Sequence, residues 1–324
     1  MGPTGTGKSS FISELAPGAT KVGHSLFSCT GDVILIEAVI DGIPCTLIDT
    51  PGFDDTEKSD TATLRLISNY LEVALREDHL LTGVIYLQRI TDNRVGNVAA
   101  KNFRMFSKLC GTAAMRNVVL CTTMWDDVEE AVGEAREKEL CDQFWRPMID
   151  AGATVMRHNG TEESALAILR HLLNKPTIVL QLQDELVNRK MKLSETAAGR
   201  EVGEDLARMM DAHREEMETL RRELSTAQET DAQAIREELA KEEEALRARD
   251  EELQLLMRGR EVEIRELSRR VEERRSSGFW DFFKTLLPHA LQILPDILAA
   301  GRSSGRSSRN GTPGRRRRRG QGNQ

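Results

Sequence analysis

Residues 2–9 form a glycine-rich motif that restricts the fold more than any other feature of the chain. They read GPTGTGKS and match the pattern G-x-x-x-x-G-K-[ST] at every position. In this pattern a loop opens a helix, and its backbone N–H groups surround the phosphates of a nucleotide. The lysine reaches the β and γ oxygens, and the serine hydroxyl holds Mg²⁺. The motif therefore predicts an α/β fold and a nucleotide as the ligand.

Residues 1–176 alternate between strand and helix patterns, which predicts a three-layer α/β domain. Val33–Ile40 and Thr46–Ile48 are apolar runs around an Asp41-Gly42 turn signal, so we expect an antiparallel hairpin. Short apolar runs at 83–87, 117–121 and 153–156 suit strands, the first two being buried and parallel. Helical patterns cover the segments 8–15, 60–76, 98–109, 133–149 and 162–173.

The phosphate-loop motif is preceded only by Met1, although a strand normally leads into such a loop. That strand would lie centrally in the sheet, beside the strands that end near Asp49 and Leu87. Without it we expect a loop anchored on one side only and a sheet with a gap flanked by unpaired backbone groups. This suggests a fragment or a mis-assigned start, with low stability on its own.

Two further motifs end apolar strands. In Asp49-Thr50-Pro51-Gly52, the aspartate can accept a hydrogen bond from a Mg²⁺-bound water, and the N–H of Gly52 can sense a γ-phosphate. In Thr123-Met124-Trp125-Asp126, the final carboxylate can accept two hydrogen bonds from guanine that adenine cannot donate. The alternative for Asp126 is that it caps the next helix together with Asp127.

The segments GPTGTGKSSF, LIDTPGFDDT and TTMWD together resemble regulatory GTPases. The resemblance is closest to the septin-like group, which also contains the immunity-associated nucleotide-binding proteins and chloroplast outer-envelope import receptors. Within that group, VGHSLFSCT, GVIYLQRITDNR and RHNGT resemble uncharacterised fungal G-domain proteins. The resemblance covers residues 1–175 and implies a P-loop G domain that binds GTP or GDP with Mg²⁺.

The resemblance also implies roles for the residues that match the family motifs. Thr30 would be a switch threonine that closes on Mg²⁺ and the γ-phosphate, and Asp49 with Gly52 would form the second switch. Mg²⁺ would contact Ser9, Thr30 and Asp49, and the catalytic residues would be Lys8, Thr30 and Gly52. The nucleotide would contact Gly2, Gly5, Thr6, Gly7, Lys8, Ser9, Ser10, Asp49, Gly52, Thr123, Asp126, His158 and Asn159.

Several positions depart from the usual pattern or leave alternatives open. Met124 replaces the lysine of N-K-x-D and carries no charge, so we expect modest guanine affinity. Phe53 stands where many GTPases place a glutamine that orients water, so we expect slow hydrolysis. Thr20, Ser25 and Ser28 compete with Thr30 for the switch role. In a dimer across the nucleotide face, a partner's phosphates could be reached by His24, Arg89 or Arg94, which are otherwise ordinary surface residues.

Residues 177–277 have a helix-forming composition. Apolar residues follow alternating spacings of four and three from Leu206 to Leu224 and again from Leu253 to Val271, where Arg260 interrupts them. The two blocks are out of phase, and the stretch between them is mostly charged. This predicts a long helix with coiled-coil segments and a phase break. The alternative is a lone charged helix.

The last two segments have contrasting compositions. Residues 278–300 are apolar but broken by charges and two prolines, which favours an amphipathic segment over a spanning helix. Residues 301–324 contain eight arginines and no acidic residue, which predicts a disordered tail. Together, residues 278–324 could bind a membrane surface or an acidic partner. The rest of the chain is more acidic than the net charge of −7 suggests, so we expect no specific nucleic-acid interface.

The sequence therefore predicts a Mg²⁺-dependent, slow GTPase that acts as a molecular switch or a nucleotide-controlled assembly module. It would form a homodimer through the G domain or the coiled coil. The five cysteines show no C-x-x-C spacing and no signal peptide is visible, so we expect a cytoplasmic protein, with peripheral membrane binding as an option. The alternatives are a non-hydrolysing GTP-dependent scaffold, a truncated inactive coiled-coil interaction protein, and an ATPase.

Overall fold

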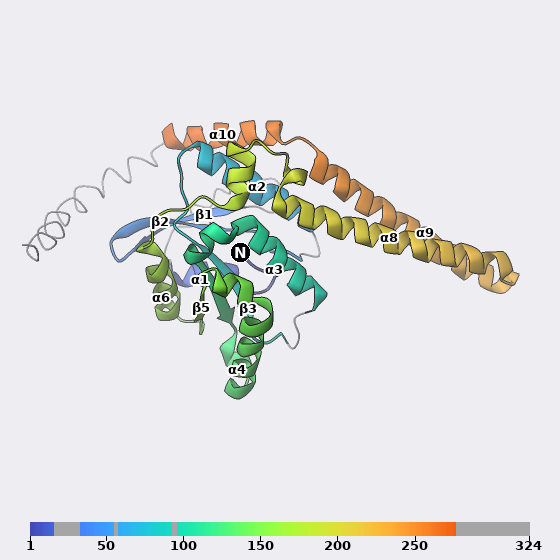
Figure 1. Cartoon of the computed structure of the whole chain (residues 1–324), viewed down its shortest axis with the longest axis horizontal. Helices are drawn as coiled ribbons and strands as arrows, with labels where there is room; N and C mark the ends of the chain where they lie inside the picture. The colour runs from blue at the N-terminus through green and yellow to red at the C-terminus, as the bar shows by residue number, and fades with distance from the viewer. Residues whose placement is uncertain (16–32, 55–57, 93–95, 277–324) are drawn as a thin grey trace, which may run out of the picture. The chain divides into compact units, whose positions relative to one another are not determined.

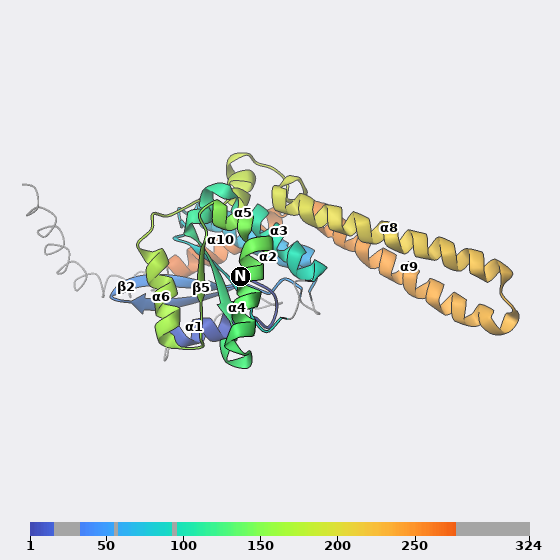
Figure 2. The same cartoon turned by 60° about the horizontal axis from the view of Figure 1, so that its bottom comes forward.

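The fold begins with α/β elements and continues into long helices, as Figures 1 and 2 show. This computed structural model describes residues 1–15, 33–54, 58–92 and 96–276. Outside the described residues lie the predicted amphipathic segment and basic tail (278–324) and several candidate site residues, namely Thr20, His24, Ser25, Ser28, Thr30 and Arg94.

The predicted hairpin is present as β1 (Ile34–Ile40) and β2 (Ile43–Asp49), which pair antiparallel. Asp41 and Gly42 form its two-residue turn, both with left-handed backbone angles (φ of 51° and 79°). Such a turn matches the twist of paired strands and suits Asp-Gly. The turn is also tied to a helix, because Arg170 donates to both carboxylate oxygens of Asp41 at 2.6 and 2.8 Å.

The predicted parallel strands are also present, in a second sheet. β3 (Val84–Arg89) pairs with β4 (Val118–Thr123), and β4 pairs with β5 (Thr154–Arg157). The helices α3 (Asn97–Cys110) and α4 (Glu130–Glu139) occupy the two connections. The carboxyl ends of β3, β4 and β5 therefore meet at one edge of this sheet, where the base-recognition motif was expected.

The first residues of the chain lie between the two sheets, which are not hydrogen-bonded to each other within the described residues. On one side, the N–H of Leu87 donates to the carbonyl of Met1 at 2.9 Å. On the other, Pro3 forms a parallel bridge with Phe53, and the N–H of Thr4 donates to the carbonyl of Phe53 at 3.2 Å. The expectation that the phosphate loop is anchored on one side only is therefore wrong.

Alternate residues of the parallel strands face two separate apolar clusters, as expected for a sheet covered on both faces. Tyr86 and Leu120 belong to the cluster that contains α2 (Asp60–Arg76) and α3. Leu87 and Val119 belong to the cluster that contains α1 (Lys8–Leu15) and α6 (Glu162–Leu173). Helix, sheet and helix thus form the three predicted layers of a mixed α/β G domain.

The segment expected to form one helix over 133–149 is interrupted. After α4 comes a wide turn of π-helix at Leu140–Phe144, and then the short helix α5 (Arg146–Asp150). The N–H of Trp145 donates to the carbonyl of Leu140 at 2.7 Å, and the indole is fully buried. A π-turn contains one residue more than an α-helical turn, so it shifts the positions of the following side chains around the helix axis.

A short irregular segment connects the α/β region to the long helices. It contains α7 (Gln181–Gln183), a π-turn at Asp184–Asn188 and a 3₁₀ turn at Leu193–Glu195. Leu180, Leu182 and Leu193 are buried in the same cluster as α2 and α3. The segment therefore completes the core and is not an open linker.

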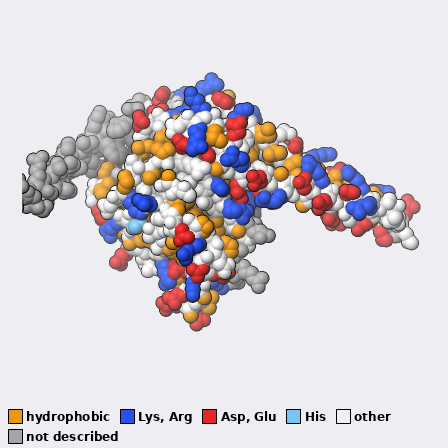
Figure 3. All heavy atoms as spheres, viewed as in Figure 1, with side chains coloured by type: hydrophobic (Ala, Val, Ile, Leu, Met, Phe, Trp, Pro, Cys, Tyr) orange, Lys and Arg blue, Asp and Glu red, His pale blue; other side chains and the backbone are white. Residues whose placement is uncertain are grey.

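The region predicted to be helical is helical, but the expectation of one long helix is wrong. The chain forms an antiparallel pair, α8 (Ala197–Thr226) and α9 (Glu229–Met257), which lie side by side in Figures 1 and 2. The chain reverses at residues 227–228, so the apolar seam of α8 finds its partner in the same chain. His213 contacts Glu242 at 2.6 Å across the pair. Acidic and basic side chains intermix over the hairpin (Figure 3). No helix within the described residues is both long and apolar enough to cross a membrane.

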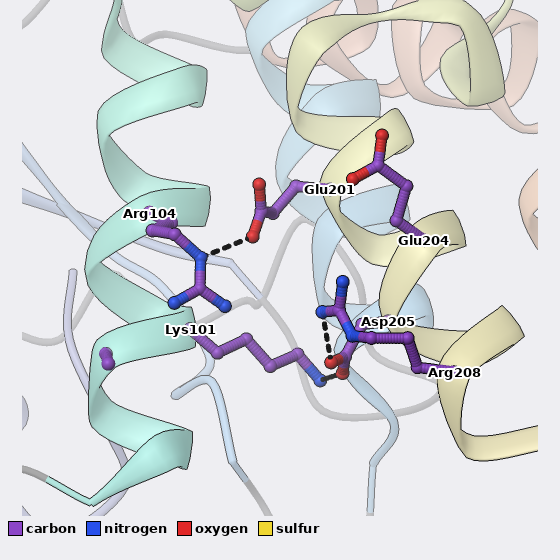
Figure 4. A pocket seen from close by; sticks show the side chains of 7 residues that line it. Lys101, Arg104, Glu201, Glu204, Asp205 and Arg208 are labelled. Carbon is purple, nitrogen blue, oxygen red and sulfur yellow. Dashed lines mark hydrogen bonds and ion pairs between the residues drawn. The ribbon is translucent and has the colours of Figure 1, made fainter. Parts of the chain in front are cut away.

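The base of this hairpin is joined to α2 and α3 by ion pairs. Lys101 contacts Asp60 at 2.8 Å and Asp205 at 2.5 Å, and Arg104 contacts Glu201 at 2.6 Å. Figure 4 shows Lys101, Arg104, Glu201 and Asp205 lining a groove between α3 and α8. The volume of this groove is about 480 Å³. Because Asp60 begins α2, Lys101 connects the start of that helix to α8.

A second joint connects α2 to the segment between α9 and α10 (Glu261–Ser276). Arg65 of α2 is only 5% exposed and donates to three backbone carbonyls near the end of α9, those of Leu255, Arg258 and Gly259. It also pairs with Glu263 at 2.9 Å. These bonds satisfy carbonyl groups that the end of a helix leaves without partners.

Arg260 forms the other half of this joint and is 8% exposed. Its guanidinium pairs with Glu72 of α2 at 2.6 Å and donates to Asn69 at 2.9 Å. The arginine that interrupts the apolar pattern in the sequence thus faces a buried carboxylate. Beyond it, Ile264 and Leu267 of α10 pack against Val73.

Candidate nucleotide-binding site

The phosphate loop is closed by its own side chains. The hydroxyl of Thr6 donates to the carbonyl of Pro3 at 2.9 Å, and the Lys8 ammonium donates to the carbonyls of Pro3 and Gly2 at 2.7 and 3.1 Å. Gly7, directly before α1, has a φ of 83°, a conformation that residues with a Cβ rarely adopt. The loop thus leads directly into the N-terminus of α1, where anions are favoured.

The two residues predicted to hold Mg²⁺ and described by the structure are in direct contact. The hydroxyl of Ser9, in the first turn of α1, donates to a carboxylate oxygen of Asp49 at 2.7 Å. Asp49 ends β2 and is 9% exposed. Hydroxyl and carboxylate oxygens suit Mg²⁺, which usually takes one or two protein ligands plus phosphates. Within the described residues, no group of three or more His, Cys, Asp or Glu side chains is placed to hold a metal ion.

The second predicted switch touches the phosphate loop. A Cβ on Gly52 would lie 2.4 Å from the hydroxyl oxygen of Thr4 and 2.8 Å from its backbone nitrogen, so only glycine fits. The next residue, Phe53, is fully buried in the main core. A phenylalanine ring has no hydrogen-bonding group, and this ring is buried, so it cannot orient a water molecule. Thr4 is a site residue that the motif alone did not single out, because it stands at a variable position.

The base-recognition motif is joined to the phosphate loop through Thr123. Its hydroxyl lies 3.1 Å from the carbonyl oxygen of Thr6 and 3.3 Å from that of Gln88. Met124 follows with a left-handed backbone (φ of 61°), and Asp126 is exposed in the short turn Trp125–Asp127. A carboxylate beyond the end of β4 is thus accessible to a ligand.

The indole of Trp125 is held beside Asp126 by two contacts. Its Nε1 donates to the hydroxyl of Thr122 at 3.1 Å, and the guanidinium of Arg157 lies 4.1 Å from the ring centroid. Glu137 in turn pairs with Arg157 at 2.5 Å. Stacking of this kind orders the turn that carries Asp126. Arg157 belongs to the RHNGT segment but was assigned no role there, and no motif in the sequence pointed to Glu137.

The two residues expected beside the guanine differ in their surroundings. Asn159 is exposed and accepts a hydrogen bond from the hydroxyl of Thr161 at 2.7 Å. His158 is 4% exposed, with its Nε2 3.1 Å from Glu14 and its Nδ1 2.8 Å from Ser164. Burial lowers the pKa of His158, while the charge of Glu14 acts in the opposite direction. In this structure His158 therefore connects α1 to α6.

The remaining residues predicted to contact phosphates lie in the loop or directly after it. Gly2 lies against β3, where a Cβ would be 2.3 Å from the carbonyl of Leu87. Gly5 has a φ of 78° and lies beside the guanidinium of Arg89, and Ser10 is exposed in the first turn of α1. The structure thus brings the three motifs together through Ser9–Asp49, Thr4–Phe53 and Thr123–Thr6.

Comparison with known proteins agrees with this geometry. Residues 1–108 match the model of the 50S ribosome-binding GTPase family. This part of the chain has the sequence and the fold of a P-loop GTPase domain. GTP-binding protein A of Dictyostelium discoideum is 28% identical over 130 residues, which are 40% of this chain. The chain spans 28% of the length of that relative.

Solved structures with a similar arrangement include Toc33 from Arabidopsis thaliana in complex with GDP and Mg²⁺. The sequences are 16% identical, the TM-score is 0.42, and the match covers 55% of this chain and 85% of Toc33. Translation elongation factor SelB from Methanococcus maripaludis, in complex with a GTP analogue, matches with 11% identity and a TM-score of 0.38. That match covers 55% of this chain and 34% of SelB.

Proposed function

We propose that this chain binds GTP and Mg²⁺ and hydrolyses GTP slowly, acting as a switch or a nucleotide-controlled assembly module. The observation that carries the proposal is the contact between motifs far apart in the sequence. Ser9 meets Asp49, and Thr123 meets Thr6, so groups for the metal, the phosphates and the base surround one loop. This convergence of the three motifs supports a guanine nucleotide as the ligand.

In the proposed reaction, a water oxygen forms a bond to the γ-phosphorus while the bond from that phosphorus to the β–γ bridging oxygen breaks. The products are GDP, inorganic phosphate and one proton, with no covalent intermediate. Lys8 and the loop N–H groups stabilise the charge that develops on the phosphate oxygens. Ser9 and Asp49 would hold Mg²⁺, with Thr30 as a further ligand, and the ion would neutralise phosphate charge.

Slow hydrolysis is supported by the position of Phe53. Its side chain is buried, so the residue after Gly52 cannot position the attacking water. A scaffold in which binding alone controls assembly is therefore the second candidate function. Single-turnover measurements on the full chain distinguish the two, because a switch converts bound GTP to GDP whereas a scaffold retains it.

Dimerisation across the nucleotide face belongs to the same proposal. The resemblance to the septin-like group supports it, and dimerisation is described as important for the GTPase activity of the Toc33 and Toc159 components. Binding of a membrane surface or an acidic partner by residues 278–324, and a cytoplasmic location, are further proposals that rest on composition alone.

The first test is a nucleotide titration on the full chain. Fluorescent GTP in magnesium buffer should bind, and unlabelled GTP should displace it at a concentration at least tenfold lower than ATP. The reason is that a carboxylate accepting two hydrogen bonds from guanine contributes about 1.5–3 kcal/mol for each bond to a charged group. A chain that binds neither nucleotide, or prefers ATP, would contradict the proposal.

Asp126→Asn tests the base assignment. We expect GTP affinity to fall at least tenfold and xanthosine triphosphate affinity to rise, because an amide can donate to the 2-oxo group of xanthine whereas a carboxylate cannot. Competition titrations with both nucleotides measure the change. Asp127→Asn, one position later in the same turn, is the matched control and should leave the preference for GTP intact. Equal GTP affinity in both variants would show that Asp126 does not recognise the base. The alternative that Asp126 caps the next helix is wrong, because the N-cap residue of α4 is Glu129.

A further inference from the structure

Arg89 is a positively charged residue of the site that the motifs do not account for. It ends β3 and lies in register with Thr123, which begins the base-recognition motif on β4. Its guanidinium reaches the phosphate loop: Nη1 is 3.2 Å from the position that a Cβ on Gly5 would take. The side chain thus spans from the base motif to the middle of the loop.

The orientation of Arg89 is fixed from its outer side. Its Nε pairs with Asp92 at 3.1 Å, and Asp92 also accepts a hydrogen bond from Gln88 at 2.7 Å. The Arg89 side chain is 37% exposed, so the guanidinium is accessible at the loop. A carboxylate that holds one edge of a guanidinium leaves the other nitrogens to bind a second group.

The adjacent motif lacks the charge that this position supplies. Met124 stands where N-K-x-D has a lysine, so the T-M-W-D segment contributes no cation to the nucleotide site. Arg89 is the neighbour of Thr123 across the sheet, and its guanidinium lies against Gly5. A cation is therefore present beside the loop, although it comes from a different strand.

We propose that Arg89 replaces the missing lysine of the base motif and binds oxygen atoms of a guanine nucleotide held by its own subunit. This rests on the proposed function. The same contact would be made with GDP and GTP, because it does not depend on the γ-phosphate. Arg89 thus increases the affinity for the nucleotide. It acts within one subunit, unlike an arginine inserted by a dimer partner.

The first experiment measures binding of fluorescent GDP and GTP to the full chain and to Arg89→Ala. We expect the affinities for GDP and GTP to fall by a similar factor of about ten. This is the loss expected when one charge-assisted hydrogen bond is removed. Arg89→Lys should lose less affinity than Arg89→Ala, because a charge remains although the fork of the guanidinium is lost. Arg146→Ala, an exposed arginine on α5, is the matched control, and equal urea midpoints show that the variants are folded.

The decisive experiment is rescue. In the double variant Arg89→Ala, Met124→Lys the charge returns at the position of the usual motif, so we expect affinity to recover to within about threefold. If Arg89 had a purely structural role, the change Met124→Lys would not restore nucleotide affinity. To exclude action in trans, Arg89→Ala is mixed with excess Lys8→Ala protein, which retains Arg89. Recovery of binding in this mixture would overturn the proposal, as would unchanged affinity in Arg89→Ala.

The outcomes separate this inference from the proposed function. If the wild type binds no guanine nucleotide, the proposed function fails, and the role of Arg89 fails with it. If the wild type binds GTP and Arg89→Ala binds equally well, only the role of Arg89 is wrong. A variant that keeps its GDP affinity but hydrolyses GTP more slowly would also overturn it, since the effect would then depend on the γ-phosphate.

Discussion

Glu72→Gln lowers the free energy of unfolding by about 3 kcal/mol, because it leaves the Arg260 cation without a charged partner in a place that excludes water. Glu72 is 3% exposed and Arg260 is 8% exposed, so solvent cannot replace the lost interaction. Urea unfolding followed by circular dichroism measures the change, since most of the described residues are helical. Because glutamine has the same size as glutamate, the substitution creates no cavity that would add to the loss of stability.

The control is Asp150→Asn, the same change of carboxylate to amide in an exposed ion pair. Asp150 and its partner Arg146 are 60% and 62% exposed, and such pairs contribute about 0–1 kcal/mol. Replacing both Glu72 and Arg260 by methionine should recover much of the lost stability, because burying neither charge avoids the desolvation cost. A loss below about 1 kcal/mol in Glu72→Gln would show that the joint between α2 and α10 is open in solution.

Lys8→Ala weakens binding of GTP in magnesium buffer about 100-fold, because hydrogen bonds from an ammonium to phosphate oxygens contribute about 1.5–3 kcal/mol each. The ammonium of Lys8 lies within the phosphate loop, where it donates to the carbonyls of Gly2 and Pro3. Displacement of fluorescent GTP measures the effect on the full chain.

Lys138→Ala, which removes an exposed lysine from α4, is the control and should bind GTP as the wild type does. The free energy of unfolding of Lys8→Ala should fall only slightly, since the ammonium is partly exposed. If Lys8→Ala retained GTP affinity within about threefold, the loop would not be the phosphate site, and the proposed function would have to be abandoned.

Local chemistry made much of the α/β region predictable. The Asp41-Gly42 turn set the register of the hairpin, and the helix expected at 60–76 is α2 with the same limits. The interruption near Trp145 was not predictable, because a π-turn depends on which side chain the core accepts and not on the spacing before it.

The arrangement of the long helices was also not predictable from local sequence. Their helical character follows from composition, but the reversal at 227–228 has neither glycine nor proline to mark it. The position of Arg260 in an apolar pattern looked like a defect in a coiled coil. Arg260 stands there because it pairs with Glu72 on α2. Sequence periodicity cannot reveal a contact between such distant segments.

Within the site, the motifs predicted which groups meet but not how each is held. The contact of Ser9 with Asp49 follows from the spacing of two known patterns. The burial of His158 does not, because it depends on the ring of Phe11, 5.0 Å away, and on Glu14. No nucleotide motif includes Arg89, and its position beside Gly5 depends on the pairing of β3 with β4 and on the path of the loop.

The bonds from Arg65 to the carbonyls at the end of α9, and from Arg260 to Glu72 of α2, have a practical consequence for anyone who shortens this chain. A protein cut after residue 176 would keep every nucleotide motif, yet α2 would lose the carbonyls that receive Arg65 and the apolar cover over Val73. Residues 1–272 form one compact unit. An expression clone intended for measurements of GTP binding should therefore extend past Leu267.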